Sequence, residues 1–251
     1  MKPSIIILYI LYAIISYGGT IDPTNDDQQY IEYGSKFKYV AKLCGTYEDN
    51  TLFCASAVLI DNHNFLTAAH VVKNYKQAVI KLDDKKEIVV KEVIIHKEFN
   101  SDFGYYDIAI GHTEEPFNLE FYPDLYDKDD EIGKLCCISG FGINGTFNTG
   151  AQLSDNKRRA GSNKIDSTDR DLLVCSPSRR GDRNHTSLEF LIASGDSGGG
   201  LFIDGRLAGI NSCVIAIDKK PDSTYTDESG HTRISKFLLW IKKHRYEKQK
   251  K

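Results

Sequence analysis

The sequence predicts an all-β fold, built as barrels or a sandwich, that is followed by one C-terminal α-helix. Two observations support this prediction. Short apolar runs rich in β-branched and aromatic residues recur along the chain, and many are bounded by Gly, Asn or Asp, as strands joined by tight turns are. A helical periodicity of apolar side chains occurs only in the last segment. The strand–helix alternation of an α/β fold is missing.

The predicted strands follow a polar, acidic lead-in over 20–30, which we expect to be short and flexible. A long polar run over 144–170 predicts a connection between two halves, so we expect two barrels of comparable size that divide near it. The predicted strands are 37–43, 53–60, 64–72, 77–82, 87–96, 105–111, 134–142, 171–176 and 201–217.

Two local patterns refine these elements. Asp204 and Gly205 lie within the last apolar run, and the Asp-Gly pair favours a two-residue hairpin turn. In the final segment Ile234, Phe237 and Ile241 fall on one face of a helix with a basic end. The sequence therefore predicts a C-terminal helix over about 235–246.

Composition narrows the class of protein. The chain has 251 residues, of which 41% are hydrophobic and 27% are charged, as in a soluble globular protein with ample residues for a core. The net charge of -3 is too small to indicate a nucleic-acid or membrane-surface partner. We expect neither.

The first residues, 1–19, have the layout of a secretory signal peptide. Lys2 precedes an apolar run over 5–15, and small residues follow at Ser16, Gly18 and Gly19. This run is shorter than the about 20 apolar residues that span a bilayer, although a membrane anchor is the alternative interpretation. We exclude 1–19 from the fold and expect a secreted, extracellular protein with no membrane contact after its removal.

Export makes the six cysteines candidates for disulfide bonds, and their spacing does not choose among the pairings. No spacing typical of a zinc site is present, so we expect no metal. Asn144 (NGT) and Asn184 (NHT) lie in sequons and are candidate N-glycosylation sites. The cysteines are at 44, 54, 136, 137, 175 and 213.

The stretch LIASGDSGGGLFIDG contains a candidate nucleophile, Ser197, among glycines. A serine hydroxyl becomes nucleophilic when a neutral imidazole, held by a buried carboxylate, takes its proton. His70 ends one strand-like segment (FLTAAHVV) and Asp107 lies in another (YYDIAIG). The order His, Asp, Ser is a known order for such a triad. Gly195 and the glycines after Ser197 permit a tight turn that aims backbone N–H groups at an oxyanion.

The motifs TAAH, DIAI and GDSGG together resemble the trypsin-like (chymotrypsin-family) serine proteases. They stand in the family's order, 37 and then 90 residues apart, and the likeness runs from about Ile31 to Ile241. Weaker matches are FCASAVLI, VIIHKEF, ISGFG and TRISKFLLWI. The resemblance implies a peptidase domain over 31–251. It consists of two antiparallel six-stranded Greek-key β-barrels packed face to face, over about 31–140 and 141–235, and the C-terminal helix.

By that resemblance His70 is the general base, Asp107 orients it and Ser197 is the nucleophile. The N–H groups of Gly195 and Ser197 form the oxyanion hole. The implied reaction is acylation of Ser197 followed by hydrolysis of the acyl-enzyme, on protein or peptide substrates. The resemblance implies no cofactor, and we expect a monomer.

The family also pairs a newly exposed N-terminal amine with the acid beside the nucleophile, here Asp196. The segment YIEYGSKF is the only one similar to the family's cut site, which makes Ile31 the new N-terminus and 20–30 a short propeptide. Tyr30 is neither Lys nor Arg, so a trypsin-like activator does not cut there. Either a chymotrypsin-like activating protease makes the cut, or the protein does not use this switch.

The cysteines depart from the family's pattern. Val71 stands where the family has the partner of Cys54, and we expect Cys44 to replace it. Cys136 matches a family position, but its partner position is Ile203 here. The remaining pairings are left open.

The specificity pocket departs further. By the resemblance Leu191, six positions before the nucleophile, stands at the pocket base, where a trypsin has a carboxylate. Ser212 keeps the strand that binds the substrate backbone, Val214 replaces a glycine at the pocket wall, and Ser229 is a further substrate-binding position. An apolar base and a narrowed wall predict cleavage after small or medium apolar residues, not after Lys or Arg.

Two other interpretations compete with a trypsin-like protease. GDSGG also fits the nucleophile elbow of α/β-hydrolases, with Asp227 and His231 as downstream partners. That fold needs a helix after Ser197, where the sequence predicts strand and turn, so we reject it. The second is a secreted, non-catalytic protease homologue that acts as a binding protein. The changed pocket and the residue at position 30 keep this alternative open.

Overall fold

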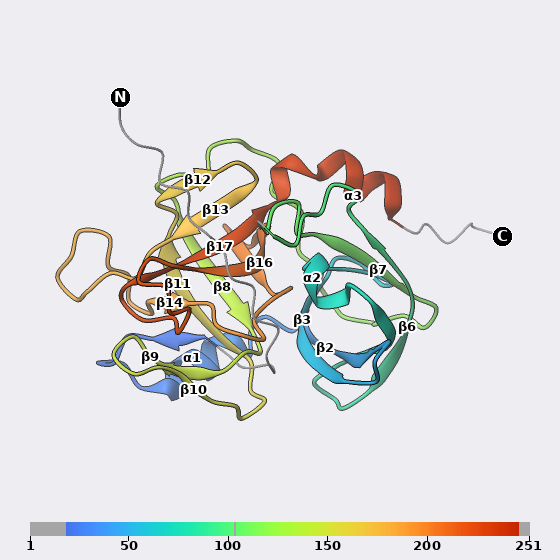
Figure 1. The fold of residues 1–251 in the computed structure, drawn as a ribbon, viewed down its shortest axis with the longest axis horizontal. Helices are drawn as coiled ribbons and strands as arrows, with labels where there is room; N and C mark the ends of the chain where they lie inside the picture. Colours follow the sequence, from blue (N-terminus) through green and yellow to red (C-terminus); the bar gives the residue numbers. More distant parts are fainter. Residues whose placement is uncertain (1–18, 103, 246–251) are drawn as a thin grey trace.

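The computed structural model describes residues 19–102 and 104–245 (Figure 1). Its ribbon has two β-rich halves that lie side by side, with few helices (Figure 1). The predicted all-β, two-barrel class with a C-terminal helix is confirmed. Residues 1–18 of the predicted signal peptide lie outside the described part of the chain. No helix among the described residues is long and apolar enough to cross a membrane.

The first half is a closed antiparallel barrel whose strands pair in the order β2-β3-β4-β7-β6-β5. A short helix, α2 (Ala69–Val72), follows β4 at the edge of this barrel. The strands are β2 (Val40–Tyr47), β3 (Leu52–Leu59), β4 (Asn64–Thr67), β5 (Tyr75–Lys81), β6 (Glu87–Ile95) and β7 (Ala109–Thr113).

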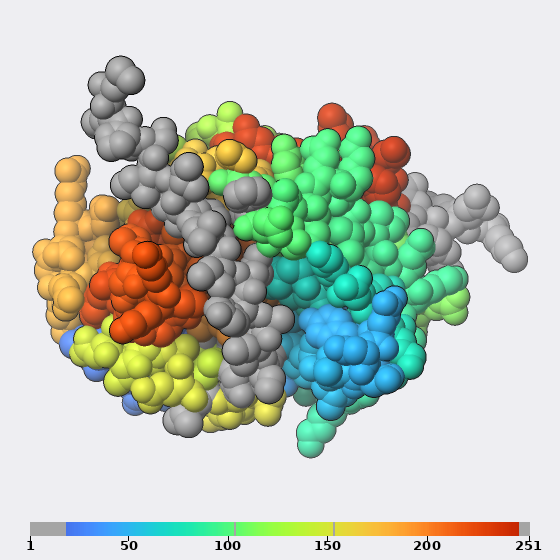
Figure 2. Space-filling model, viewed as in Figure 1, coloured from blue at the N-terminus to red at the C-terminus, as the bar shows by residue number. Residues whose placement is uncertain are grey.

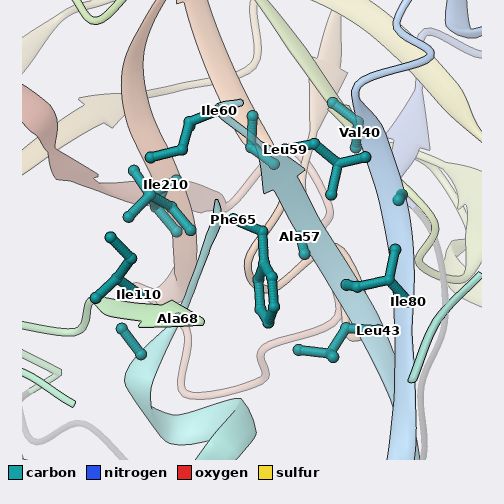
Figure 3. Packing of buried hydrophobic residues seen from close by; sticks show 14 of the residues in the cluster. Val40, Leu43, Ala57, Leu59, Ile60, Phe65, Ala68, Ile80, Ile110 and Ile210 are labelled. Carbon is teal, nitrogen blue, oxygen red and sulfur yellow. The ribbon is translucent and has the colours of Figure 1, made fainter. Parts of the chain in front are cut away.

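Phe65 lies at the centre of the barrel core (Figure 3). Its ring occupies the space beside Gly111 on β7, where an added Cβ would stand 2.1 Å from the ring carbon Cζ. Ile210, from the second half, packs in the same cluster (Figure 3). The two halves therefore share apolar core across their boundary, which fixes how they sit against each other.

The second half is a seven-stranded antiparallel sheet in the order β11-β8-β15-β16-β17-β13-β12, next to a four-stranded sheet in the order β10-β9-β1-β14. The strands of the larger sheet are β8 (Leu135–Gly140), β11 (Arg159–Lys164), β12 (Ser167–Asp169), β13 (Leu172–Cys175), β15 (Gly200–Ile203), β16 (Arg206–Ala216) and β17 (Asp227–Arg233). Those of the smaller sheet are β1 (Thr20–Ile21), β9 (Asn144–Thr146), β10 (Gly150–Leu153) and β14 (Phe190–Leu191).

The predicted division of the chain differs from the structure at both ends of the first half. The strand β8 ends at Gly140 but pairs with β11 and β15, so it belongs to the second half. The lead-in over 20–30 is not flexible: it contains β1 and the first half of helix α1 (Asp27–Gly34), and both pack on the second half. Asp26 caps α1 through the Gln28 N–H, and Tyr30 is fully buried.

The polar run over 144–170 is not a bare connection, since it contains β9, β10, β11 and β12. Several of its polar side chains are buried and hydrogen-bonded, among them Arg159 and Asn163. Arg159 is 1% exposed and donates hydrogen bonds to both Asp27 and Asp155. Asn163 donates to the Phe190 carbonyl. The hydropathy of the sequence hides these strands because hydrogen bonds, rather than apolar side chains, satisfy their buried positions.

The predicted hairpin and helix are both present. Asp204 and Gly205 have φ values of 49° and 75° between β15 and β16, as a two-residue hairpin turn with two left-handed residues requires. A 3₁₀ turn (Ile234–Lys236) leads into α3 (Leu238–His244). The buried Ile241 of α3 packs in the cluster of the first barrel, so the last helix returns to the first half.

Candidate active site

Three side chains meet where the two halves join. His70 lies in α2, directly after β4, and Asp107 precedes β7, the strand that pairs with β4. Ser197 lies in the turn between β14 and β15. The first half therefore supplies the imidazole and the carboxylate, and the second half supplies the hydroxyl.

The three side chains form a continuous chain of hydrogen bonds. His70 Nδ1 is 2.7 Å from Asp107 Oδ2, and the His70 backbone N–H donates to Asp107 Oδ1 at 2.9 Å. His70 Nε2 is 3.0 Å from Ser197 Oγ. With Nδ1 protonated and donating to the carboxylate, Nε2 is the nitrogen that accepts the serine proton.

Charge and burial set the protonation of this pair. Burial alone would raise the pKa of Asp107, but the charge of His70 and the hydrogen bonds from His70 and Ser212 outweigh it and lower that pKa. Burial would lower the pKa of His70, but the charge and the hydrogen bond of Asp107 raise it above the ordinary value of 6.5. At neutral pH the carboxylate is ionised and ready to stabilise an imidazolium.

The second half also holds the carboxylate directly. Ser212 Oγ donates to Asp107 Oδ2 at 2.6 Å, and Thr232 Oγ1 donates to the Asp107 carbonyl at 2.9 Å. Ser212 was predicted only as a substrate-binding position, and Thr232 was not predicted at all. No local sequence signal identifies these contacts, because they join residues more than a hundred positions apart.

Glycines shape the turn around Ser197. Gly195 and Gly198 have φ values of 92° and 84°, which favour glycine. A Cβ at Gly198 would also stand 2.1 Å from the Ser56 carbonyl oxygen. Among the described residues, no backbone carbonyl is recorded as an acceptor for the N–H of Gly195 or of Ser197. These two N–H groups are the predicted oxyanion hole.

Ser56, on β3, anchors this turn from the first half. Its N–H donates to the Ser197 carbonyl at 2.9 Å, and its hydroxyl donates to the Gly195 carbonyl at 3.0 Å. The Phe141 N–H in turn donates to that hydroxyl at 3.0 Å. Sequence reasoning missed Ser56, which stands two residues after Cys54 with no pattern to mark it.

The predicted specificity residues lie on three strands of the second half, β14, β16 and β17. Leu191 is fully buried on β14, and Val214 pairs with Ser229 across β16 and β17. Ser229 is also fully buried, and its hydroxyl donates to the Cys175 carbonyl at 3.3 Å. None of these positions carries a charge.

Two segments of the second half, 147–151 and 222–225, contact each other, and the yellow-green and orange-red parts of the chain adjoin on the face shown in Figure 2. The Ala151 N–H donates to the Asp222 carbonyl at 2.9 Å, and the rings of Phe147 and Tyr225 meet edge to face at 5.1 Å. Ser223, in the second segment, donates through its hydroxyl to the Ile192 carbonyl at 2.9 Å, one residue beyond Leu191.

The structure does not bring Ile31 and Asp196 together. Ile31 lies inside α1, and no recorded contact joins it to Asp196. The Asp196 carboxylate is fully buried and accepts hydrogen bonds from the Gly142 and Ala193 N–H groups.

The rejected hydrolase partners are engaged elsewhere. His231 contacts Asn211 and Ser229, and burial lowers its pKa to about 3, which keeps it neutral. Asp227 accepts from the Ser223 N–H.

The predicted disulfide between Cys44 and Cys54 is present and joins directly paired residues of β2 and β3. Of the sequons, Asn184 is exposed and Asn144 is half-buried.

Sequence comparisons add family information to this geometry. The family model of trypsin matches residues 31–241. Tonin of Rattus norvegicus is 25% identical over 266 residues, covering 94% of this chain and 97% of tonin. Glandular kallikrein-10 of Rattus norvegicus is 25% identical over 265 residues, covering 93% of this chain and 96% of the kallikrein.

Solved structures agree on the fold. Neuropsin, a serine protease expressed in the limbic system of mouse brain, superposes with a TM-score of 0.66 at 24% identity, over 84% of this chain and 95% of neuropsin. HL collagenase superposes with a TM-score of 0.67 at 18% identity, over 92% of this chain and 97% of the collagenase.

Proposed function

Because this chain belongs to the trypsin family of serine proteases, we propose that it is a secreted endopeptidase that hydrolyses peptide bonds through Ser197, His70 and Asp107. One observation carries this proposal. An unbroken chain of hydrogen bonds runs from Ser212 through Asp107 and His70 to the Ser197 hydroxyl.

In the proposed acylation step, Ser197 Oγ attacks the carbonyl carbon of the scissile bond while its proton passes to His70 Nε2. The negative charge on Asp107 stabilises the imidazolium that results. The carbonyl oxygen becomes an oxyanion that accepts hydrogen bonds from the N–H groups of Gly195 and Ser197. The C–N bond then breaks, and His70 returns its proton to the leaving amine.

Deacylation repeats these roles with water. His70 Nε2 takes a proton from a water molecule, whose oxygen attacks the ester carbon of the acyl-Ser197. The C–O bond to the serine breaks, the proton returns to Ser197 Oγ, and the product leaves as a carboxylic acid. The residues present need no cofactor for either step.

We propose cleavage after small or medium apolar residues. Leu191 offers no counter-charge to a Lys or Arg side chain at the pocket base, and Val214 narrows the wall. His231 lies behind Ser229 as a neutral, buried ring, so it adds no charge to the pocket either.

The remaining proposals concern the setting of the enzyme. We propose an extracellular monomer that acts on proteins or peptides, on the evidence of the predicted signal peptide and of its family. Asn184 is the more favourable of the two glycosylation sites because it is exposed in the loop between β13 and β14.

Labelling with a fluorophosphonate probe tests catalysis directly. The protein purified from a secreting host should be labelled on Ser197, and a Ser197→Ala variant with the same melting temperature should not be. If the folded protein resists the probe and also cleaves no member of a peptide library, the non-catalytic binding protein becomes the better interpretation.

A library of peptide substrates tests the pocket. The expected preference is Ala, Val or Leu before the cut, and Val214→Gly should shift it towards Phe and Tyr by widening the wall. A preference for Lys or Arg in the native protein would refute the proposed specificity and leave the catalytic proposal intact.

A further inference from the structure

Two buried thiols meet in the core of the second half. Cys136 lies on β8 and Cys175 ends β13, and their Sγ atoms are 3.9 Å apart. The two residues are 1% and 0% exposed and belong to one apolar cluster with Ile138 and Leu173. The strands β8 and β13 are not neighbours, since β15, β16 and β17 lie between them in the sheet. The thiols therefore meet across the interior of the second half.

This geometry suits a disulfide bond. An S–S bond is about 2.05 Å long, so the two sulfur atoms need to approach by less than about 2 Å. Rotation of each side chain about its Cα–Cβ bond changes their separation without moving the strands. As thiols, Cys136 donates to the Asn163 carbonyl at 3.3 Å, and the recorded hydrogen-bond partner of the Cys175 thiol is Cys136.

The other two free cysteines lie elsewhere. Cys137 is the next residue of β8, and successive side chains of a strand point to opposite faces. It packs against the cluster of the first half, and its Sγ is 2.7 Å from the Tyr33 hydroxyl. Cys213 lies on β16, beside Ser212. Within the described ranges, Cys136 and Cys175 are the one pair of free cysteines recorded with their sulfur atoms in contact.

We propose that Cys136 and Cys175 form a second disulfide bond as the exported chain folds, and that this bond ties β8 to β13 through the core of the second half. Exported proteins fold where thiols are oxidised, which the predicted signal peptide implies for this chain. The pair departs from the family's pattern, in which the partner of Cys136 stands at the position of Ile203. The inference goes beyond the proposed function, because it depends on export and not on catalysis. Cys137 and Cys213 remain thiols.

The oxidant is a disulfide of the secretory compartment, carried by a thiol oxidoreductase or by a small-molecule thiol. The thiolate of one cysteine attacks a sulfur of this oxidant, which breaks the oxidant's S–S bond, forms a mixed disulfide and releases one thiolate. The thiolate of the second cysteine then attacks the sulfur of the first and releases the other. Two electrons pass from the cysteine pair to the oxidant, whose two sulfurs take up the two thiol protons.

Burial decides when this exchange occurs. The hydrogen bond with Cys136 and burial both raise the pKa of the Cys175 thiol. The folded chain therefore holds little of the thiolate that exchange requires, and the apolar cluster keeps an oxidant away from both sulfur atoms. We expect the bond to form before the core closes.

Counting free thiols tests the bond. The full chain is purified from the medium of a secreting host, freed of N-glycans, denatured without reductant and treated with N-ethylmaleimide. Its intact mass should show two labelled thiols, and six after reduction, because Cys44–Cys54 and Cys136–Cys175 are then both opened. Four labelled thiols in the unreduced chain would overturn the proposal.

Peptide mapping identifies the partners. A tryptic digest made without reductant should contain peptide 135–157 linked to peptide 171–179. The first peptide carries both Cys136 and Cys137, so the digest is repeated on the Cys137→Ala variant, which should keep the link. Loss of the link in that variant, or a link from Cys175 to any other cysteine, would overturn the proposal.

Two neighbouring substitutions give a matched comparison. Cys136→Ala should raise the number of labelled thiols from two to three, because it frees Cys175. Cys137→Ala should lower it from two to one. If Cys136 and Cys175 were both free, each variant would instead lower the number, from four to three, and the proposed bond would be wrong.

Melting temperatures test what the bond contributes. Without reductant, Cys136→Ala should melt about 5–15 °C below the native chain, the shift expected for loss of one disulfide from a chain of this size. When both chains are refolded in reductant, the difference should fall below about 5 °C, because only the packing of the side chain is then lost. An equal difference under the two conditions would overturn the stabilising role of the bond.

The fluorophosphonate probe, applied to the same preparation before it is denatured, separates this proposal from the proposed function. A chain that is labelled on Ser197 but has four free thiols keeps the proposed function and overturns the bond. A chain with two free thiols and the mapped link, but with no label on Ser197, keeps the bond and counts against the proposed catalysis.

Discussion

At the scale of single residues, the candidate site depends on one buried carboxylate. Asp107 accepts three recorded hydrogen bonds, from the His70 ring, the His70 backbone and Ser212. These bonds engage both oxygens of the carboxylate and so fix its orientation. The carboxylate in turn favours the tautomer with the proton on His70 Nδ1, which leaves Nε2 as an acceptor that faces Ser197.

Replacing this carboxylate by an amide tests that role. Asp107→Asn should lower kcat by about 10⁴-fold, because an amide neither selects the required tautomer nor stabilises the imidazolium. Steady-state hydrolysis of the best peptide substrate measures it. The variant should still fold, as shown by its melting curve, and a loss smaller than tenfold would contradict the role assigned to Asp107.

The pH dependence of kcat/KM follows from the raised pKa of His70. The base works only when neutral, so activity is present above its pKa and lost as the pH falls through it. Burial lowers the pKa of His70, but the charge and hydrogen bond of Asp107 outweigh burial and raise this pKa above 6.5. The midpoint of the acid limb of the profile should therefore lie above pH 6.5. A limb below 6.5, measured at constant ionic strength, would show that the charge of Asp107 does not control His70.

At the scale of elements, helix α1 and strand β11 depend on a buried guanidinium. Arg159 donates to both carboxylate oxygens of Asp27 in α1 and to Asp155 beside its own strand. The Arg159 side chain is 1% exposed, whereas the side chain of Asp27 is 41% exposed. The burial cost of the cation is therefore offset by two carboxylates that still reach water.

Arg159→Met should destabilise the protein by about 1–3 kcal/mol, because it removes the hydrogen bonds that tie α1 to β11. Urea unfolding followed by fluorescence measures the change. Arg206→Met is the matched control: its ion pair with Asp127 is largely exposed, and its loss should cost less than about 1 kcal/mol. Equal effects of the two variants would show that the pairs of Arg159 do not hold α1.

At the scale of the whole molecule, the site exists only where the two halves meet. The first half carries the proposed base and its carboxylate, and the second half carries the proposed nucleophile and two donors to Asp107. The shared apolar cluster that includes Phe65 and Ile210 holds this junction together. The atoms that we propose to react are thus positioned by the packing of the halves rather than by any one loop.

Ser212→Ala tests the junction. Loss of the donor to Asp107 Oδ2 should lower kcat/KM by about tenfold, as expected for a hydrogen bond to a charged group. It should also shift the acid limb of the pH profile to higher pH, because a carboxylate with fewer donors holds the His70 proton more strongly. Thr232→Val is the control, since it removes a contact to the Asp107 backbone only. Thr232→Val should lower the free energy of unfolding by about 1 kcal/mol and leave the acid limb of the pH profile unshifted.

The sequence by itself determined the family and the fold class, and it proposed His70, Asp107 and Ser197, which the structure brings within hydrogen-bond distance. It could do so because the family's motifs are local and each element beside them has a local pattern. The Asp204–Gly205 hairpin and the C-terminal helix were predictable for the same reason. It also paired Cys44 with Cys54, as a replacement for the family's own partner of Cys54.

Only the tertiary structure showed which residues support the proposed triad. It also showed that the segment expected to be a flexible lead-in already forms β1 and part of α1. Ser56, Ser212 and Thr232 reach the site across long separations, and no local pattern encodes such contacts. The polar run over 144–170 and the lead-in over 20–30 resemble loops in hydropathy. They become strands and a helix because buried partners such as Arg159 satisfy their polar groups, and burial of that kind is a property of the folded chain alone.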